Sequence, residues 1–219
     1  MCNPVCINSD NSMYIFIRSS NLNNSVYYDI HYYNISMYPL AYTICRRWTI
    51  IIHINLTIMK IAITGHRPNK LGNDYDLISN LVQHIKGQLQ SIINEHKPTQ
   101  LISGMALGID TLWAKLAIEN NIPLLAALPC QNQDKMWPQK SKLIYKDILD
   151  NPLTTSHLVT DCEYNSKCMQ DRNIYMVDNC DLLVAVWDGA SGGTGNCVRY
   201  ANSVDKKIII INPNLYKFI

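Results

Sequence analysis

Three short segments combine glycine with residues that can hold an anion or move a proton. The first is Thr64-Gly65-His66-Arg67-Pro68. Its glycine permits a sharp turn and a close approach of the backbone to a ligand. The Arg67 guanidinium could meet a phosphate with its forked donors, and His66 could exchange a proton near neutral pH. An ordinary turn with a solvated arginine would contain the same residues, so this segment alone leaves function open.

The second segment, Ser103–Asp110, has the sequence SGMALGID. Gly104 and Gly108 would precede a helix, where free backbone N–H groups and the helix dipole favour an anion. The spacing fits neither the dinucleotide fingerprint nor a Walker loop, which has a lysine after its last glycine. Asp110 either caps the helix or accepts hydrogen bonds from sugar hydroxyls. Ser103, Gly104, Gly108 and Asp110 are therefore candidate ligand contacts.

The third segment, Asp188–Asn196, has the sequence DGASGGTGN and holds four glycines within seven residues. Glycine is costly in chain entropy, so a simple connector would rarely need so many. A loop that cradles a phosphate does need them. This segment gives the strongest single indication of function, with Asp188, Gly192, Gly193 and Thr194 as candidate contacts.

Other reactive residues are less specific. If a bond is cleaved, Asp110, Asp188 and His66 are the candidates for proton transfer. Arg172 alone resembles a solvated residue, but its helix leads into the strand before the third segment, so it is also a candidate contact. The eight cysteines include no C-x-x-C pair and no histidines at zinc-ligand spacing, which predicts free thiols and no metal site. No cofactor is required by these motifs.

Apolar runs and amphipathic segments alternate around the three motifs. Strands are expected at 60–64, 100–102, 123–128, 158–160, 181–187 and 207–211, and helices at 77–96, 110–120, 139–149, 166–179 and 195–203. Asp74 and Asp76 would cap the first helix. This alternation predicts an α/β fold, a Rossmann-like three-layer sandwich with a mostly parallel sheet. Such sheets bind ligands at the carboxyl ends of their strands, so the motifs should converge on one phosphate-binding pocket.

The composition changes sharply at Met59, because every glycine lies after it. We therefore predict two parts: residues 1–58 as a poorly structured N-terminal extension, and 59–219 as the functional domain. Met1–Asp10 lacks the features of a signal peptide, and the run Trp48–Met59 is too short for a membrane helix. We favour a start of translation at Met59. A natively expressed chain with the mass of all 219 residues would contradict it.

Together the three segments resemble the SLOG superfamily, which includes the DNA-processing protein DprA, the LOG-type nucleotide phosphoribohydrolases and the YpsA group. Residues 64–68 are similar to the opening of the YpsA group, and 103–110 to the S-G-x-A-x-G-I-D signature of YpsA-like and DprA-like members. Residues 172–194, with Tyr200-Ala201, are similar to the closing half of that group. The resemblance spans 59–219 and implies a Rossmann-like fold with a pocket for nucleotides. The LOG enzymes carry a catalytic glutamate where Arg199 stands here, so LOG-type hydrolysis is disfavoured unless Asp110 or Asp188 substitutes.

Three functions are consistent with these observations. We favour a sensor or adaptor that binds a nucleotide or an NAD- or ADP-ribose-like ligand. The alternatives are a hydrolase of an N-glycosidic or phosphoester bond in such a ligand, and DprA-like binding of single-stranded DNA. The formal net charge of +2, from 19 basic and 17 acidic residues, gives no basic stripe, so DNA is not favoured and no membrane partner is expected. We expect a cytoplasmic protein, and the sequence allows a homo-oligomer.

Overall fold

The computed structural model describes the chain except residues 1–2, 6–12, 23–24, 35–48, 56–57 and 217–219. It separates into two compact units, Met1–Ile58 and Met59–Ile219. The segment Met1–Asp10, which we weighed as a signal peptide, lies mostly outside the described residues. No helix in the described ranges is both long and apolar enough to cross a membrane.

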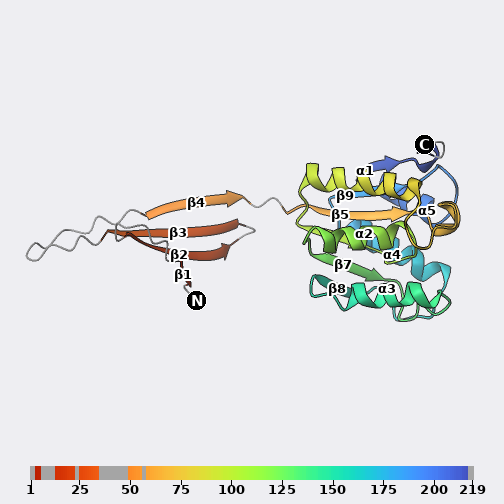
Figure 1. Ribbon diagram of the computed structural model, residues 1–219, viewed down its shortest axis with the longest axis horizontal. Coiled ribbons are helices and arrows are strands. Elements are labelled where there is room, and N and C mark those ends of the chain that lie inside the picture. Colours follow the sequence, from red (N-terminus) through yellow and green to blue (C-terminus); the bar gives the residue numbers. More distant parts are fainter. Residues whose placement is uncertain (1–2, 6–12, 23–24, 35–48, 56–57, 217–219) are drawn as a thin grey trace, which may run out of the picture. The chain divides into compact units, whose positions relative to one another are not determined.

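The first unit contributes four strands to a sheet of its own (Figure 1). They are β1 (Asn3–Val5), β2 (Met13–Leu22), β3 (Ser25–Asn34) and β4 (Thr49–Asn55). Neighbours pair antiparallel in the order β1-β2-β3-β4. Among the described residues, the strands of this sheet are distinct from those of the sheet in the second unit.

The second unit is built on a six-stranded parallel sheet. Its strands are β5 (Lys60–Gly65), β6 (Gln100–Ser103), β7 (Leu124–Leu128), β8 (Thr154–Leu158), β9 (Leu182–Val186) and β10 (Lys207–Ile211). Their order is β10-β9-β5-β6-β7-β8. Strand β9, between β10 and β5, is buried along its whole length, as expected of a parallel strand covered on both faces.

Five helices cover the two faces of this sheet. They are α1 (Asn80–His96), α2 (Ile109–Glu119), α3 (Gln139–Leu149), α4 (Ser166–Asp178) and α5 (Gly193–Ser203), with short 3-10 turns η1 (Pro68–Lys70) and η2 (Pro213–Tyr216). One apolar core joins α1, α2 and α3 to the sheet, and a second joins α4 and α5 to the other face. The predicted three-layer α/β sandwich is therefore confirmed.

The first helix starts later than the predicted Leu77. Ser79 is its N-cap, and the side chain of Ser79 accepts a hydrogen bond from the backbone N–H of Val82. Asp74 does not cap the helix directly. Its carboxylate accepts from the Ser79 N–H at 2.7 Å and so supports the capping residue. Leu77 has a positive φ of 60°, which interrupts a helix before Asn80.

One further expectation about local structure was wrong. The short strand expected at 158–160 is β8, which begins at Thr154. Four of its five residues are exposed, so this edge strand has no apolar run that would predict it. The buried face of α4 carries Arg172 and Asn173, and Met169 on the same helix lies at a cavity. Buried polar groups require partners, and these partners form the candidate site.

Candidate functional site

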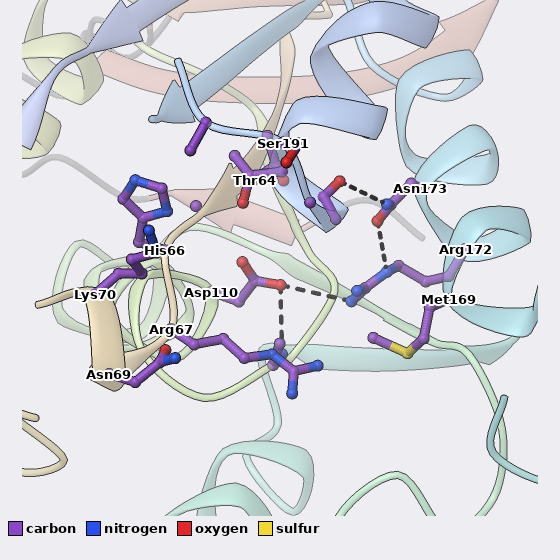
Figure 2. Close-up of a pocket in the computed structure, with 16 residues that line it drawn as sticks. Thr64, His66, Arg67, Asn69, Lys70, Asp110, Met169, Arg172, Asn173 and Ser191 are labelled. Atoms are coloured by element: carbon purple, nitrogen blue, oxygen red, sulfur yellow. Dashed lines mark hydrogen bonds and ion pairs between the residues drawn. The ribbon is translucent and has the colours of Figure 1, made fainter. Parts of the chain in front are cut away.

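The order of strands in the second unit reverses between β5 and β9, because β6, β7 and β8 follow on one side of β5 whereas β9 and β10 lie on the other. Parallel α/β sheets bind ligands at this reversal, outside the carboxyl ends of the strands. A cavity of about 210 Å³ lies there, lined by the loops after β5, β6 and β9 and by α4 (Figure 2).

Nine of the thirteen predicted ligand contacts line this cavity. They are Thr64, Gly65, His66, Arg67, Asp110, Arg172, Gly192, Gly193 and Thr194. The other four, Ser103, Gly104, Gly108 and Asp188, lie outside the lining. The structure thus brings the three motifs to one cavity. All four predicted contacts of the first motif line it, and those outside the lining belong to the second and third motifs.

A buried ion pair forms one wall of the cavity. Arg172 and Asp110 are both 5% exposed, and Arg172 Nη1 lies 3.5 Å from Asp110 Oδ2. The same oxygen accepts from the Ala106 N–H at 3.3 Å. Burial raises the pKa of Asp110, although the charges of Arg172 and Arg67 and the Ala106 hydrogen bond oppose this rise. Within the described part of the chain no donor reaches Asp110 Oδ1, so that oxygen can accept a hydrogen bond from a ligand.

Arg172, predicted as a candidate contact, is not solvated as an isolated helix arginine would be, because its guanidinium is held on several sides. Nη1 donates to the Gly104 carbonyl, and Nε donates to Asn173 Oδ1 at 3.1 Å. Asn173 in turn donates to the Gly193 carbonyl at 3.4 Å. Figure 2 shows this chain of interactions running from Asp110 through Arg172 and Asn173. It ties the loop after β6 to α4 and to the first turn of α5.

The amino end of α5 opens onto the cavity. Gly192 is its N-cap and has a φ of +141°, a backbone conformation that excludes most side chains. A Cβ added at Gly192 or Gly193 would meet no atom within 4 Å. The preceding loop is held by Trp187, whose Nε1 donates to the Ala190 carbonyl at 2.7 Å. The first N–H groups of a helix have no partner within the helix, and in α5 they belong to residues that line the cavity. This arrangement is suited to a phosphate.

The glycines and the serine of the first two motifs serve packing. A Cβ at Gly65 would lie 2.6 Å from the Ile109 side chain, and one at Gly108 would lie 2.6 Å from the His66 carbonyl oxygen. Gly104 has no room because the Arg172 guanidinium occupies the space. The Ser103 hydroxyl donates to the Asp110 carbonyl at 2.8 Å and accepts from an N–H of its own loop. These residues fix the loops that surround the cavity.

His66 and Asp188 form a second side-chain pair at the cavity. His66 Nε2 lies 3.0 Å from Asp188 Oδ1 and 3.2 Å from the Asp188 backbone nitrogen. A protonated Nε2 donates to the carboxylate, whereas an unprotonated one accepts from the N–H. A hydrogen bond from the Ala190 N–H lowers the pKa of Asp188 against the effect of burial, and the charges of His66 and Lys70 add to this lowering. Asp188 thus orients the loop after β9 and does not line the cavity.

Seven lining residues were not predicted: Asn69, Lys70, Ala106, Met169, Asn173, Ala190 and Ser191. Most of them lie inside or next to the motifs, so adjacency could have suggested them. Met169 has no such signal, because its place depends on how α4 packs on the sheet. Lys70, 53% exposed at its side chain, adds a cation to Arg67 and Arg172. Three cations and a single carboxylate, Asp110, thus line the cavity among the described residues.

No cysteine with described surroundings is among the residues that line this cavity. The five cysteines with described surroundings are free, and no cluster of histidine, cysteine and carboxylate side chains suited to a metal occurs in the described ranges. Burial raises the pKa of Cys197 to about 12 and that of Cys180 to about 11. Neither thiol ionises appreciably near neutral pH.

The model of the family described as DNA recombination-mediator protein A matches residues 60–218. The chain belongs to this family. The match covers nearly the whole second unit and none of the first, in agreement with the SLOG resemblance of residues 59–219.

Relatives of this family member include proteins of Bacillus. The SPbeta prophage-derived protein YoqJ of Bacillus subtilis is 31% identical over 128 residues, which cover 52% of this chain and 75% of YoqJ. A UPF0398 protein of Bacillus cereus is 24% identical over 145 residues, or 61% of this chain and 77% of that protein.

Two solved structures of family members share the fold. DNA processing protein A from Streptococcus pneumoniae superposes with a TM-score of 0.52 at 18% identity, over 72% of this chain and 51% of that protein. The protein from Helicobacter pylori, whose structure describes a single-stranded DNA binding mode, gives 0.52 at 21% identity, over 70% and 65%. The chain therefore spans about half to two thirds of the length of these two proteins.

Proposed function

We propose that this protein binds a nucleotide or a nucleotide-derived ligand, with a phosphate held in the cavity, and acts as a sensor or adaptor. The observation that carries the proposal is the open amino end of α5 at Gly192 and Gly193, where added Cβ atoms would meet no atom within 4 Å. Backbone N–H groups there supply donors without the desolvation cost of a buried charge. Arg67 and Lys70 add positive charge at the same opening.

Asp110 supplies the second half of the recognition. Its Oδ2 is occupied by Arg172 and the Ala106 N–H, which leaves Oδ1 to accept from a ribose hydroxyl. A volume of about 210 Å³ suits a phosphate with its sugar better than a whole dinucleotide. The rest of a larger ligand would extend out of the cavity.

A titration of the full-length protein tests this proposal. Thermal unfolding is followed with adenosine monophosphate, NAD and ADP-ribose, because a ligand of the native state raises the unfolding temperature. Gly193→Ala places a methyl group in the opening and should abolish the shift without lowering the stability of the unliganded protein. Gly87→Ala, on an exposed position of α1 with no atom near its Cβ, is the matched control and should keep the shift. The absence of a shift with all three compounds in the wild type would refute the proposal.

Binding of single-stranded DNA is the second candidate, and membership of the DNA recombination-mediator protein A family favours it. The same cavity would then hold one phosphate of the strand, with Arg67 at its exposed rim. A low-salt anisotropy titration with a labelled oligodeoxynucleotide tests this function. Binding should weaken with salt and be lost in Arg67→Ala; no change in anisotropy at low salt would exclude it.

Cleavage of the ligand is a further hypothesis, for which Asp110 and His66 are the candidate residues that line the cavity. Asp110 is the only carboxylate among the described cavity residues, because Asp188 lies outside the lining and Arg199 lies on an exposed face of α5. Chromatography for a released base after prolonged incubation with the nucleotides measures this activity. An unchanged substrate would reject a hydrolase.

A further inference from the structure

A second cavity of about 410 Å³ lies beside the first and shares one residue with it, Arg67. The Arg67 Nη2 donates to the Tyr164 hydroxyl at 3.4 Å, which turns the guanidinium toward the second cavity. A ligand whose phosphate lies at Arg67 in the first cavity would therefore have its other end at the second. The inference that follows rests on the proposed function.

Two aromatic side chains stand among the mostly polar residues that line this second cavity. Trp137 and Tyr164 both line it, and Tyr164 is 48% exposed. Met136, also in the lining, is 89% exposed within the polar segment CQNQDKMWPQ. Exposed aromatic side chains next to a cation are the surfaces on which nucleobases stack.

The Trp137 ring is held in place. It packs edge-to-face against Tyr145, with ring centroids 5.3 Å apart and an interplanar angle of 77°. The backbone N–H of Trp137 closes a turn onto the Asp134 carbonyl at 2.9 Å. A ring that is already fixed loses little conformational freedom when a base stacks on it.

Gln133 offers a polar contact at the same cavity. It is 5% exposed, and its Nε2 donates to the Met105 carbonyl at 3.4 Å and to the Tyr145 hydroxyl at 3.2 Å. Gln133 is among the residues that line the cavity, and both hydrogen bonds of its side chain use Nε2 as the donor. A buried amide with a free acceptor is suited to accept from an N–H group of a base.

We infer that the second cavity is a nucleobase subsite, in which Trp137 and Tyr164 flank the base of a nucleotide whose phosphate lies in the first cavity. Arg67 stands at the junction of the two subsites. The Gln133 carbonyl oxygen accepts from the edge of the base.

Calorimetric titrations of the full chain with adenosine monophosphate and ribose 5-phosphate test this inference, because the two ligands share the sugar and phosphate and differ in the base. The wild type should bind the nucleotide at least about tenfold more tightly. Trp137→Ala and Tyr164→Ala should remove most of this difference and leave ribose 5-phosphate unchanged. Tyr164→Ala removes an exposed ring and thus keeps the test valid if Trp137→Ala fails to fold. Tyr75→Ala, similarly exposed at 47% but lining neither cavity, is the control.

The outcomes separate the two proposals. If the wild type binds both ligands equally, or the variants leave the preference intact, the base subsite is refuted while phosphate binding stands. If neither ligand nor a short oligodeoxyadenylate binds, both proposals fall. The oligodeoxyadenylate and its abasic counterpart distinguish a free nucleotide from one within a strand. A further outcome is that the oligodeoxyadenylate binds much more tightly than adenosine monophosphate, and that Tyr164→Ala weakens its binding while leaving the abasic strand unaffected. That result would assign the same subsite to single-stranded DNA.

Discussion

Replacing Arg172 by methionine should be the most destabilising single change near the site. It would leave Asp110, 5% exposed, without its cation and would remove the donor to the Gly104 carbonyl. Breaking one side of a buried ion pair costs about 3–5 kcal/mol. We therefore expect the free energy of unfolding of Arg172→Met to fall by about 4 kcal/mol at neutral pH.

The loss should depend on pH in a defined direction. Burial raises the pKa of Asp110 above its ordinary value of 3.8, and Arg172 opposes the rise. A carboxyl with a raised pKa in the folded state contributes most to stability below its unfolded pKa, and this contribution is lost as pH rises through the folded pKa. Without Arg172 the folded pKa rises further. The difference between wild type and variant should therefore shrink as pH falls, by up to about 1.4 kcal/mol per unit.

Urea unfolding of both proteins at several pH values between 5 and 8 (roughly the range in which folded proteins are most stable) measures this difference. Helical circular dichroism reports on the second unit, because every described helix lies there. Lys86→Met is the control: it breaks an exposed pair with Glu119 and should cost less than about 1 kcal/mol at every pH. Adding Asp110→Leu to Arg172→Met should recover most of the loss. A loss that is small at neutral pH, or equal at all pH values, would refute this account of the pair.

Three further predictions concern positions outside the ion pair. Gly108→Ala should destabilise the protein by more than about 1 kcal/mol, because the φ of Gly108 is +93° and the backbone of the loop after β5 leaves no room for a methyl group. Gly87→Ala in α1 should instead stabilise the protein by about 0.5–1 kcal/mol. Chemical denaturation compares the two variants, and equal effects would contradict the packing role of Gly108. Ser79→Ala should cost about 1 kcal/mol through loss of the α1 N-cap, with earlier exchange of amide protons in the first turn as the signature. A maleimide at neutral pH should label exposed Cys162 and leave buried Cys197 unlabelled, because the pKa of Cys197 is about 12. Peptide mass mapping measures the labelling, and a labelled Cys197 in the native protein would contradict its burial.

Much of the fold could be predicted because buried strands and helices place apolar residues at regular intervals in the sequence. The run DLLVAVW is apolar at successive positions because β9 is covered on both faces. The edge strand β8 left no such record, since one side of an edge strand carries polar residues in contact with solvent. The start of α1 was misjudged because Leu77 is buried at 7% exposure without being helical. An apolar residue indicates a buried position, but a buried position can lie outside a helix, as Leu77 does.

The site was predictable as a location but not as a set of contacts. Glycine-rich loops after parallel strands must meet at one edge of the sheet, whatever their exact residues. Which glycine faces the ligand and which avoids a neighbour depends on tertiary packing: Gly193 faces open space, while Gly65 abuts Ile109. Arg172 was predicted as a contact, but its burial was not, because a buried cation is rare without a partner and its partner Asp110 lies 62 residues away. The second cavity depends on the same kind of distant pairing, between Arg67 and Tyr164.

The space shared by Gly104 and Arg172 also has a consequence for how this family can vary. The guanidinium fills the volume that a side chain at position 104 would need, so the two positions cannot change independently, although 68 residues separate them. In an alignment of relatives, a side chain larger than hydrogen at position 104 should occur only with a short residue at position 172. A larger residue at position 104 would then be tolerated only after a shorter residue had replaced Arg172, so the two positions should co-vary.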